Sequence, residues 1–496
     1  MSSSSSPCPL DAEFSDQIAA LLAPPSPQSE QEYYDELIEK TKCDGIRVKR
    51  TKKIGKGVFA NKEFKEGELI LKDQILFAAQ HSSNKVDCLV CSRCFCFIGS
   101  VELQIGRKLY FQNTGLSRKQ DCDHDTISST SEEDFPTELL DEGEGFITDH
   151  SNGVGSSTSQ KLKENSLSEE ILESLMNGDL SLPHSKNFLL PPVVACPGGC
   201  EEEHYCSQQC ADSDWGLFHS LLCNGNGVES TQRDALLRFI DHANRTNDIF
   251  ILAAKAISFV ILKYRKLKQH IENSKDKVYQ EVTDGSCFPL LFDAWKSISM
   301  GFKGRWWDCI SLPDEVSFSN EASFRMQIRD LAFTSLQLLK DAIFNKECAP
   351  LFSLEIYGTI IGMFELNNLD LVVASPVEDY FIYIDDLPFP EKEEAEKVTK
   401  RFLNALGEEY SVCCQGTGFY PLQSCMNHSC CPNAQAFKRD EDKDGQAVIL
   451  ATRSISLEEE ITISYIDEDV PFEERQALLA DYGFRCKCQK CLDEQP

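Results

Sequence analysis

Apolar and polar residues alternate near both ends of the chain, and this period of two predicts β-strands. Residues 46–60 read IRVKRTKKIGKGVFA and residues 68–79 read ELILKDQILFAA, with turns expected at Gly55, Gly57 and Gly67. Further strands are expected in AVILATRSI (447–455) and in ITISYI (461–466). The two ends of the chain therefore supply the strands of the fold.

The middle of the chain has a helical pattern instead. From residue 231 to residue 345 apolar residues recur at helical spacing. The run IFILAAKAISFVIL (249–262) is too short to span a bilayer and contains Lys255, so it predicts a buried helix. Trp306 and Trp307, among basic and apolar neighbours, favour packing over a cofactor or peptide cage. Other expected helices are residues 31–43, 391–406 and 472–484.

Two segments have the composition of disordered chain. Residues 1–30 carry a serine run and PPSPQSE, and residues 113–194 are acidic and rich in serine and glycine, with a short helix expected near 167–177. An inert tail is favoured over a phosphorylation target for the first. A solvated linker is favoured over an interaction tail for the second.

The charge balance excludes a class of partner. The 496 residues include 80 acidic and 49 basic side chains, a formal charge of −31. Such a surface repels phosphate backbones and attracts basic protein tails. Direct nucleic-acid binding is therefore not expected, and the length allows two or three domains.

The 23 cysteines indicate metal sites. The start MSSSSSPCPL has no apolar run, so no secretory signal is expected, and metal binding in a reducing compartment is favoured over disulfides. Cysteines gather at DCLVCSRCFCF (87–97), at ACPGGCEEEHYCSQQCADSDWGLFHSLLC (195–223) and at YGFRCKCQKC (482–491). Thiolates and an imidazole a few residues apart can surround one zinc ion. Buried free cysteines are the alternative.

One stretch near the C-terminus has the residues to hold a polar cofactor. Residues 423–433 read QSCMNHSCCPN, and EEEITISY follows at 458–465. The alternation of the second stretch places Tyr465 on the buried face of a strand, pointing inward. Side-chain amides and backbone groups of the first are suited to bind polar groups.

Together these two stretches resemble the second half of a SET domain, the lysine methyltransferase fold. IGKGVFA (54–60) matches the early Gly-x-Gly loop of that family, and the terminal C-x-C-x2-C matches its post-SET zinc motif. The resemblance implies an α+β fold with a split SET β-fold, a knot-like threading of the Asn-His segment, an inserted zinc module and a helical insert. It also implies S-adenosylmethionine as the cofactor.

The resemblance implies a role for particular residues. Asn427 and His428 would hold the adenosine portion of the cofactor, His428 mainly through its backbone and not as a general base. Tyr465 would lie where a lysine channel meets the methyl group, with Tyr482 as the second channel aromatic. A core tyrosine with a satisfied hydroxyl is the alternative for either. The loop residues Lys56 and Gly57 would surround the methionine portion, and Phe484 would stack on adenine.

The YCSxxC and H-x3-C spellings resemble a MYND-type finger, a module with two zinc ions. Interleaving as in that family implies two ligand sets, with Cys88 left open as a competitor in the first. This chain departs from the family in its C-x3-C pair and in the hundred residues between its first two cysteine pairs. The post-SET match implies a third structural zinc, with Cys431 as an alternative to Cys430. The three implied sets are Cys91, Cys94, Cys206 and Cys210; Cys196, Cys200, His219 and Cys223; and Cys430, Cys486, Cys488 and Cys491.

These inferences divide the chain into parts. The expected division is an N-terminal disordered or helical tail (1–44), the SET first half (45–85), the zinc module (86–112 and 195–225), the acidic loop (113–194), the helical insert (226–347), the SET second half (348–470) and the post-SET end (471–496).

The resemblance implies a protein-lysine methyltransferase. The NHSCCPN spelling and the acidic insert most resemble the plant trithorax-related members, which implies histone H3 as the substrate and regulation of transcription. The implied location is the nucleus, with the cytoplasm as an additional alternative. No basic localisation cluster stands out. The rival hypothesis is a scaffold whose zinc module binds transcription factors or other recruiting proteins while methyl transfer is weak or directed elsewhere. The target lysine and the number of methyl groups are not specified by the sequence.

Overall fold

The predicted mixed class of helices and small sheets is confirmed. The computed structural model describes residues 8–52, 54–114, 167–273, 288–301, 303–313 and 320–495. The strands are β1 (Ile46–Thr51), β2 (Gly55–Ala60), β3 (Leu69–Asp73), β4 (Phe77–Gln80), β5 (Val194–Ala195), β6 (His204–Tyr205), β7 (Asn368–Val373), β8 (Cys414–Phe419), β9 (Asn427–His428), β10 (Ala434–Ala436), β11 (Ala447–Ala451) and β12 (Glu460–Ile463).

Three small sheets join the two ends of the chain. Their strand orders are β1-β2-β12-β9, β10-β11-β3 and β4-β8-β7, while β5 and β6 form a separate pair. Each of the three combines a strand that precedes residue 81 with strands that follow residue 367. Only β9 and β12 pair in parallel, among the pairs between described strands. The chain must therefore close on itself to build the region around β9.

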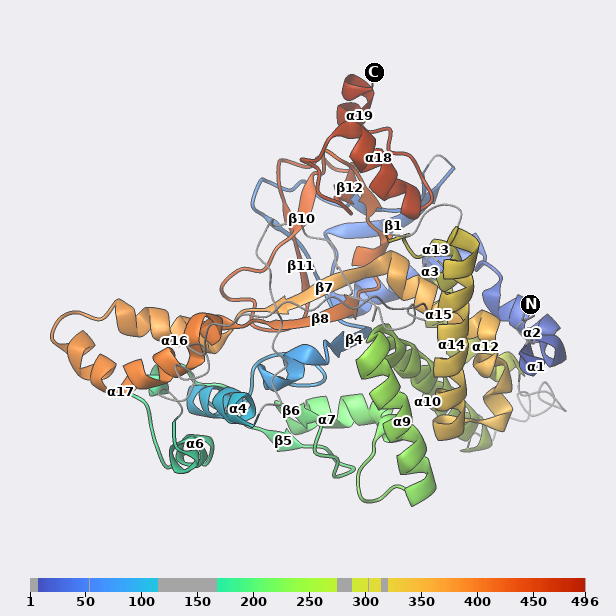
Figure 1. Cartoon of the computed structure of the whole chain (residues 1–496). Coiled ribbons are helices and arrows are strands. Elements are labelled where there is room, and N and C mark those ends of the chain that lie inside the picture. The colour runs from blue at the N-terminus through green and yellow to red at the C-terminus, as the bar shows by residue number, and fades with distance from the viewer. Residues whose placement is uncertain are drawn as a thin grey trace, which may run out of the picture.

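Long helices pack beside these sheets (Figure 1). The central helix is α10, and the predicted buried segment 249–262 within it is confirmed, because Leu252, Ile257 and Ile261 are at most 1% exposed. Trp306 and Trp307 are buried as expected. The helices are α1 (Pro9–Glu13), α2 (Ser15–Leu22), α3 (Pro27–Thr41), α4 (Val101–Asn113), α6 (Glu169–Met176), α7 (Gln208–Asp214), α8 (Ser220–Leu222), α9 (Ser230–Thr246), α10 (Ile249–Asn273), α12 (Phe288–Ser299), α13 (Trp306–Cys309), α14 (Glu321–Ile343), α15 (Leu354–Asn367), α16 (Pro376–Asp385), α17 (Glu391–Leu406), α18 (Phe472–Asp481) and α19 (Gln489–Glu494).

Shorter helical turns connect these elements. In the part of the chain that is described, no single helix is long and apolar enough to cross a membrane. One bent pair, 346–352 with 354–367, meets that test by length and composition when its two helices are taken together. The short turns are η1 (Ser83–Val86), η2 (Ser185–Asn187), the π-helical η3 (Trp215–His219), η5 (Lys346–Phe352), η6 (Gly407–Ser411) and η7 (Gln423–Cys425).

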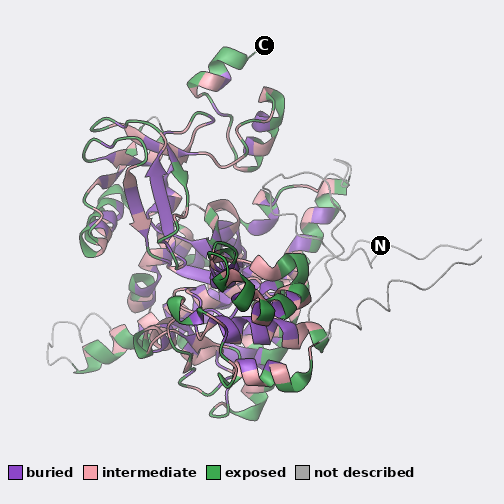
Figure 2. Ribbon diagram, turned by 90° about the vertical axis from the view of Figure 1, so that its left-hand side faces the viewer, coloured by how far each residue is buried: buried purple, intermediate pink, exposed green. Residues whose placement is uncertain are grey.

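The buried residues form several cores (Figure 2). The largest apolar cluster joins α10 with α9, α12, α14 and α15. A second cluster underlies β1, β2 and β12. A third joins α4 and α6 with α16 and α17, which project from the left side of Figure 1. The charged helix predicted at 391–406 is α17, whose Ala395, Phe402 and Leu406 face that third cluster.

The prediction of disorder over residues 1–30 is wrong for residues 8–30. Leu10, Ile18 and Leu21 are at most 9% exposed and lie in the largest core. Leu10 lies in α1, while Ile18 and Leu21 lie one turn apart in α2, and the serine- and proline-rich composition hides these two short helices. Trp295 Nε1 also donates a hydrogen bond to the Leu21 carbonyl at 2.7 Å. Residues 1–7 lie outside the described residues.

The prediction of a solvated loop over 113–194 also needs correction. The helix expected near 167–177 is present as α6, and it is not extruded. Leu172, Leu175 and Leu182 are at most 3% exposed and pack with α4. Glu102 Oε1 accepts a hydrogen bond from the Leu182 N–H at 2.9 Å. Residues 115–166 of the expected loop lie outside the described residues.

A buried carboxylate connects the first sheet strands to the C-terminal motif. Asp73, the last residue of β3, is 1% exposed. Its Oδ2 accepts hydrogen bonds from the backbone N–H groups of Leu422 at 2.7 Å and Gln423 at 2.8 Å. Burial raises the pKa of Asp73 from 3.8 to about 7, although these donors act in the opposite direction. The folded protein therefore holds the Asp73 proton more tightly than the unfolded chain does.

We expect this carboxyl to make stability depend on pH. Because its pKa is raised on folding, its contribution is fully present below about pH 4 and is lost as the pH rises to about 7. The free energy of unfolding should fall by up to about 4 kcal/mol across this window relative to Asp73→Asn, which has no titrating group. Urea unfolding of both proteins between about pH 4 and pH 7 measures this difference. Parallel pH profiles would show that Asp73 does not titrate in this range.

Candidate active site and cysteine clusters

The amide of Asn427 joins three strands. β9 runs parallel to β12, with Asn427 opposite Thr462. Asn427 Nδ2 donates to the Lys56 carbonyl of β2 at 2.9 Å and to Glu460 Oε1 of β12 at 2.8 Å. Because β9 is the last strand of its sheet, its outer backbone groups have no partner among the described strands. The arrangement leaves polar backbone beside a fixed amide.

The Gly-x-Gly loop lies against this amide. A Cβ atom on Gly57 would lie 3.0 Å from Asn427 Nδ2 and 3.1 Å from Glu460 Oε1, so a larger residue would displace them. The side chain of Lys56 is held elsewhere, since its Nζ donates to the Met300 carbonyl at 2.6 Å and to the Tyr34 hydroxyl at 2.9 Å. The structure thus brings Gly57 and the Lys56 carbonyl to Asn427.

Asn433, for which the sequence predicted no individual role, forms hydrogen bonds with β12. It is 1% exposed, and its Nδ2 donates to Glu459 Oε1 at 3.1 Å and to the Glu460 carbonyl at 2.8 Å. Its side-chain oxygen accepts the Thr462 N–H at 2.9 Å. The sequence signal for this role is that Asn433 is the second asparagine of the motif QSCMNHSCCPN. Asn433 therefore fixes β12 relative to the turn that follows β9.

Four rings gather after β9 and β12. The ring centroids are 5.1 Å apart for Tyr465 and Tyr482, 5.4 Å for His428 and Tyr465, and 5.9 Å for His428 and Phe484. The Tyr465 hydroxyl donates to the Met426 carbonyl at 2.5 Å. Burial is the first cause that raises the pKa of both tyrosines, so each phenol stays protonated. We call Tyr465, Tyr482, Phe484 and His428 the aromatic group.

The predicted strand position of Tyr465 is wrong by two residues. β12 ends at Ile463, and Tyr465 lies in the following loop. The residue is half-buried, and its backbone N–H donates to His428 Nδ1 at 3.0 Å. Burial first and the charge of Arg475 second lower the pKa of His428 to about 4, so the neutral ring accepts this bond. The hydrogen bond to the His428 side chain therefore positions Tyr465, which lies beyond the end of β12.

The structure brings together the three predicted sets of metal ligands. Within each set the four ligand atoms lie within 4.8 Å of one another. The first set comes from the turn that holds Cys91 and from the start of α7, where the Ser207 side chain accepts the Cys210 N–H at 3.2 Å. The separation of Cys94 and Cys206 by 112 positions in the sequence does not prevent this convergence. The sets are Cys91, Cys94, Cys206 and Cys210; Cys196, Cys200, His219 and Cys223; and Cys430, Cys486, Cys488 and Cys491.

The spacing of the sulfur atoms fits a tetrahedral metal. Sγ atoms are 3.6 Å apart for Cys94 and Cys206, 3.8 Å for Cys196 and Cys223, and 3.5 Å for Cys430 and Cys491. Zinc–sulfur bonds of about 2.3 Å around a tetrahedron put sulfur atoms about 3.8 Å apart. Disulfide sulfurs would be about 2.05 Å apart. The donor sets therefore fit zinc.

The second set also includes an imidazole close to its thiols. His219 Nε2 lies 3.2 Å from the sulfurs of both Cys196 and Cys200. Burial is the first cause that raises the pKa of the Cys223 and Cys210 thiols. Buried thiols lose their protons readily only beside a cation, and a coordinated metal ion supplies that charge.

The alternative cysteines lie outside the groups of four. Cys88 is buried outside the first set, with its Sγ 3.4 Å from the carbonyls of Val412 and Cys413. Cys431 is exposed and lies outside the third set. Cys96, which received no role, has its Sγ 3.5 Å from that of Cys94. It is a fifth thiol beside the first set, and the CFCF spelling was its only sequence signal.

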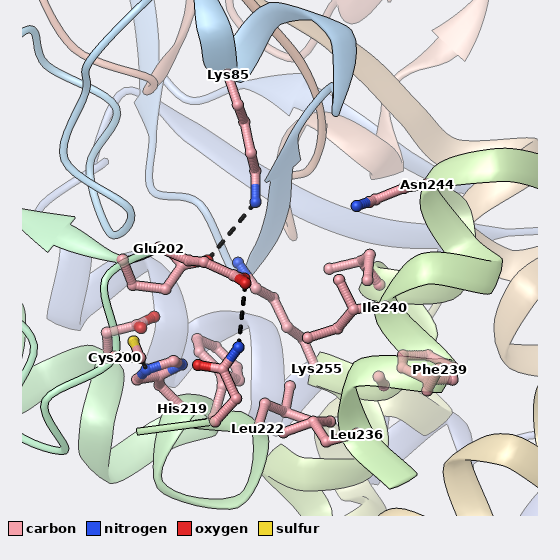
Figure 3. A pocket seen from close by; sticks show the side chains of 16 residues that line it. Lys85, Cys200, Glu202, His219, Leu222, Leu236, Phe239, Ile240, Asn244 and Lys255 are labelled. Carbon is pink, nitrogen blue, oxygen red and sulfur yellow. Dashed lines mark hydrogen bonds and ion pairs between the residues drawn. The ribbon is translucent and has the colours of Figure 1, made fainter. Parts of the chain in front are cut away.

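A small hollow, partly open to solvent, lies beside the second set (Figure 3). Its wall includes Lys85, Glu202, His219 and Lys255 together with apolar residues of α9. Glu203 forms an ion pair with Lys85 at 3.7 Å, and Glu202 accepts a hydrogen bond from Asn224 at 3.1 Å. None of the aromatic group lines this hollow. It is distinct from the methyl-transfer site considered below.

Comparison with known proteins identifies the class. The SET domain profile matches residues 55–466, and the chain belongs to the SET-domain family of methyltransferases. It is 62% identical to histone-lysine N-methyltransferase ATXR2 of Arabidopsis thaliana, over 98% of each chain. It is also 29% identical to the protein-lysine N-trimethyltransferase SMYD5 of Gallus gallus, over 65% of this chain and 72% of that protein. The family predicted from the four sequence motifs is confirmed.

Proposed function

We propose that the protein is an S-adenosylmethionine-dependent protein-lysine methyltransferase that modifies histone H3. The observation that carries this proposal is the aromatic group beside the Asn427 amide, within a chain of the SET-domain family. The names of both relatives above, a histone-lysine and a protein-lysine methyltransferase, support the substrate class. The formal charge of −31 favours a basic protein tail.

The residues near β9 fit the cofactor. We assign Asn427 and the backbone of His428 to its adenosine portion, because β9 is an edge strand next to a fixed amide. Phe484, close to the His428 ring, offers a flat apolar face to the adenine. The loop of Lys56 and Gly57 surrounds the methionine portion. When bound, the cofactor supplies an electrophilic methyl group.

The chain's own contribution is orientation and exclusion of water. We assign Tyr465 and Tyr482 to the walls of a lysine channel, with the Tyr465 hydroxyl placing the amine. A lysine must be neutral to attack, and a narrow aromatic channel disfavours its charged form by desolvation. Holding two reactants in line accounts for most of the rate gain in such a transfer. The neutral His428 is occupied as an acceptor and does not serve as a base.

The remaining assignments follow from the proposed class. The first two ligand sets would form a MYND-type module with two zinc ions, and the third set a post-SET zinc. The segment of Asn427 would be threaded under the loop of Tyr465, in keeping with the parallel pairing of β9 and β12. We propose the same domain division, with residues 8–30 joined to the helical core and α6 joined to α4 instead of to a solvated loop. Action on histones would take place in the nucleus, in the regulation of transcription.

We expect three equivalents of zinc per chain. Each set offers four donors at tetrahedral spacing, and structural zinc prefers four. Purified protein analysed by inductively coupled plasma mass spectrometry should therefore contain about three zinc ions, and strong chelators should lower its melting temperature. A folded protein with no zinc, and with all thiols reactive to a thiol reagent, would contradict this assignment.

Methyl transfer onto histones tests the function. The wild-type protein should transfer radiolabelled methyl groups to recombinant histone H3, and mass spectrometry should locate them on lysine. Asn427→Ala should bind the cofactor at least about tenfold more weakly. The variant loses the proposed contact with the adenosine portion and also the two hydrogen bonds to the Lys56 carbonyl and Glu460 that fix the site. If the wild-type protein methylates neither free histone H3 nor H3 in nucleosomes, the histone substrate is rejected. Transfer to other proteins would then identify a different lysine substrate.

A further inference from the structure

The N-terminal helix α3 packs on the hairpin that carries the Gly-x-Gly loop (Figure 1). β1 and β2 pair antiparallel with Arg50 opposite Lys56, so the hairpin places two cations side by side, next to Gly57. Like charges directly opposite each other destabilise a pair of strands. An anion beside these two residues is therefore needed to stabilise the hairpin in this form.

Glu30, in the first turn of α3, supplies that charge. It is 4% exposed. Its Oε2 accepts a hydrogen bond from Arg50 Nε at 2.6 Å, and its Oε1 accepts one from Arg50 Nη2 at 2.9 Å. Lys56 Nζ lies 4.0 Å from the same Oε1. One buried carboxylate thus lies beside both cations of the hairpin, and its two-pronged contact with Arg50 fixes its orientation.

Tyr34 lies one turn after Glu30 on the same face of α3 and also contacts Lys56. It is 2% exposed, and its hydroxyl accepts a hydrogen bond from Lys56 Nζ at 2.9 Å. Its ring belongs to the apolar cluster that contains Met426, the residue before Asn427. The helix α3 therefore contacts the Gly-x-Gly loop directly and shares a core with the segment that carries Asn427.

Lys56 connects α3 to the candidate cofactor site. Its ammonium group binds Tyr34, whereas its carbonyl accepts a hydrogen bond from Asn427 Nδ2 at 2.9 Å. Gly57, the next residue, lies against the same Asn427 amide. Because the side chain and the carbonyl of Lys56 are both held, a displacement of its side chain would also displace the carbonyl that orients Asn427.

We propose that Glu30 is a positioning residue for the cofactor, because it holds the Gly-x-Gly loop in its binding form through Arg50 and Lys56. This inference rests on the proposed function, since it concerns the same cofactor site. Glu30 acts through the hairpin and not by contact with the cofactor. The helix α3, which precedes the first SET strand, is then part of the methyl-transfer domain and not a separate tail.

Neutralising Glu30 tests this assignment. By calorimetry, Glu30→Gln should bind S-adenosylhomocysteine at least about tenfold more weakly, because Arg50 and Lys56 are left opposite each other without an anion. Adding Arg50→Gln removes one of the two facing charges and should restore the affinity to within about threefold of the wild-type value. Glu36→Gln, which removes an exposed charge of the same helix, should bind as the wild-type protein does.

A second variant serves if Glu30→Gln is too unstable to measure. Tyr34→Phe keeps the ring in its core and removes only the hydroxyl that Lys56 contacts. It should bind S-adenosylhomocysteine about threefold or more weakly than the wild-type protein. Unchanged affinity in this variant would contradict the connection from α3 through Lys56 to the cofactor site.

The outcomes separate this inference from the function on which it rests. Normal affinity in Glu30→Gln would overturn the positioning role. A loss of affinity that Arg50→Gln does not reverse would overturn it as well, because Glu30 would then only stabilise the fold. Failure of the wild-type protein to bind S-adenosylhomocysteine would instead reject the proposed function, and the inference with it.

Discussion

Replacing Cys486 by serine is expected to abolish measurable cofactor binding and to remove one equivalent of zinc per chain. Cys486 follows Phe484 by two residues and belongs to the third ligand set with Cys430, which follows His428 by two. A metal ion in this set would tie the C-terminal segment to β9. Because metal binding contributes to folding free energy, its loss should disorder the segment that holds Tyr482 and Phe484.

Cys431→Ser is the matched control for this prediction. Cys431 is the chain neighbour of Cys430 but is exposed and outside the ligand set. The control should keep three zinc ions and normal affinity for S-adenosylhomocysteine in calorimetry. Normal cofactor affinity in Cys486→Ser would contradict the coupling between the metal and the cofactor site.

Tyr465→Phe is expected to lower the rate of methyl transfer about 100-fold or more while cofactor affinity changes less than about threefold. The ring would keep its contacts with Tyr482 and His428, and only the hydroxyl is lost. By our proposal this hydroxyl places the amine, so its removal should act on the transfer step. Single-turnover measurement with radiolabelled cofactor on histone H3 separates that step from binding.

A structural role of the hydroxyl would give a different result. The hydroxyl donates to the Met426 carbonyl, and Met426 precedes Asn427. If the bond served only to hold this backbone, cofactor affinity and transfer rate would fall together in Tyr465→Phe. The ratio of the two losses therefore decides the role.

Much of the fold could be predicted because its elements carry their own periodicity. The long helices α10 and α14 and the strands β1, β2 and β11 have enough residues for a pattern to repeat. β9 has two residues, and so its parallel pairing with β12 has no periodic signal. The helices α1 and α2 have five and eight residues, too few for a pattern to repeat, and they lie in a serine- and proline-rich segment.

The sequence predicted the motif residues of the candidate site but not those that belong to it through tertiary contacts. Motifs with fixed spacing identified Asn427, His428 and the cysteines, and tertiary contacts then decided between Cys88, Cys431 and their rivals. Asn433 belongs to the site only through contacts made across the fold. No local pattern marks a residue whose partner is distant in the chain.

Calorimetry of the folded, zinc-loaded protein with S-adenosylmethionine and with its demethylated product tests the central claim most directly. We predict saturable binding of both at one site per chain. A preparation that contains three zinc ions and unfolds cooperatively, yet gives no binding signal with either compound, would contradict the assignment of a cofactor site at β9.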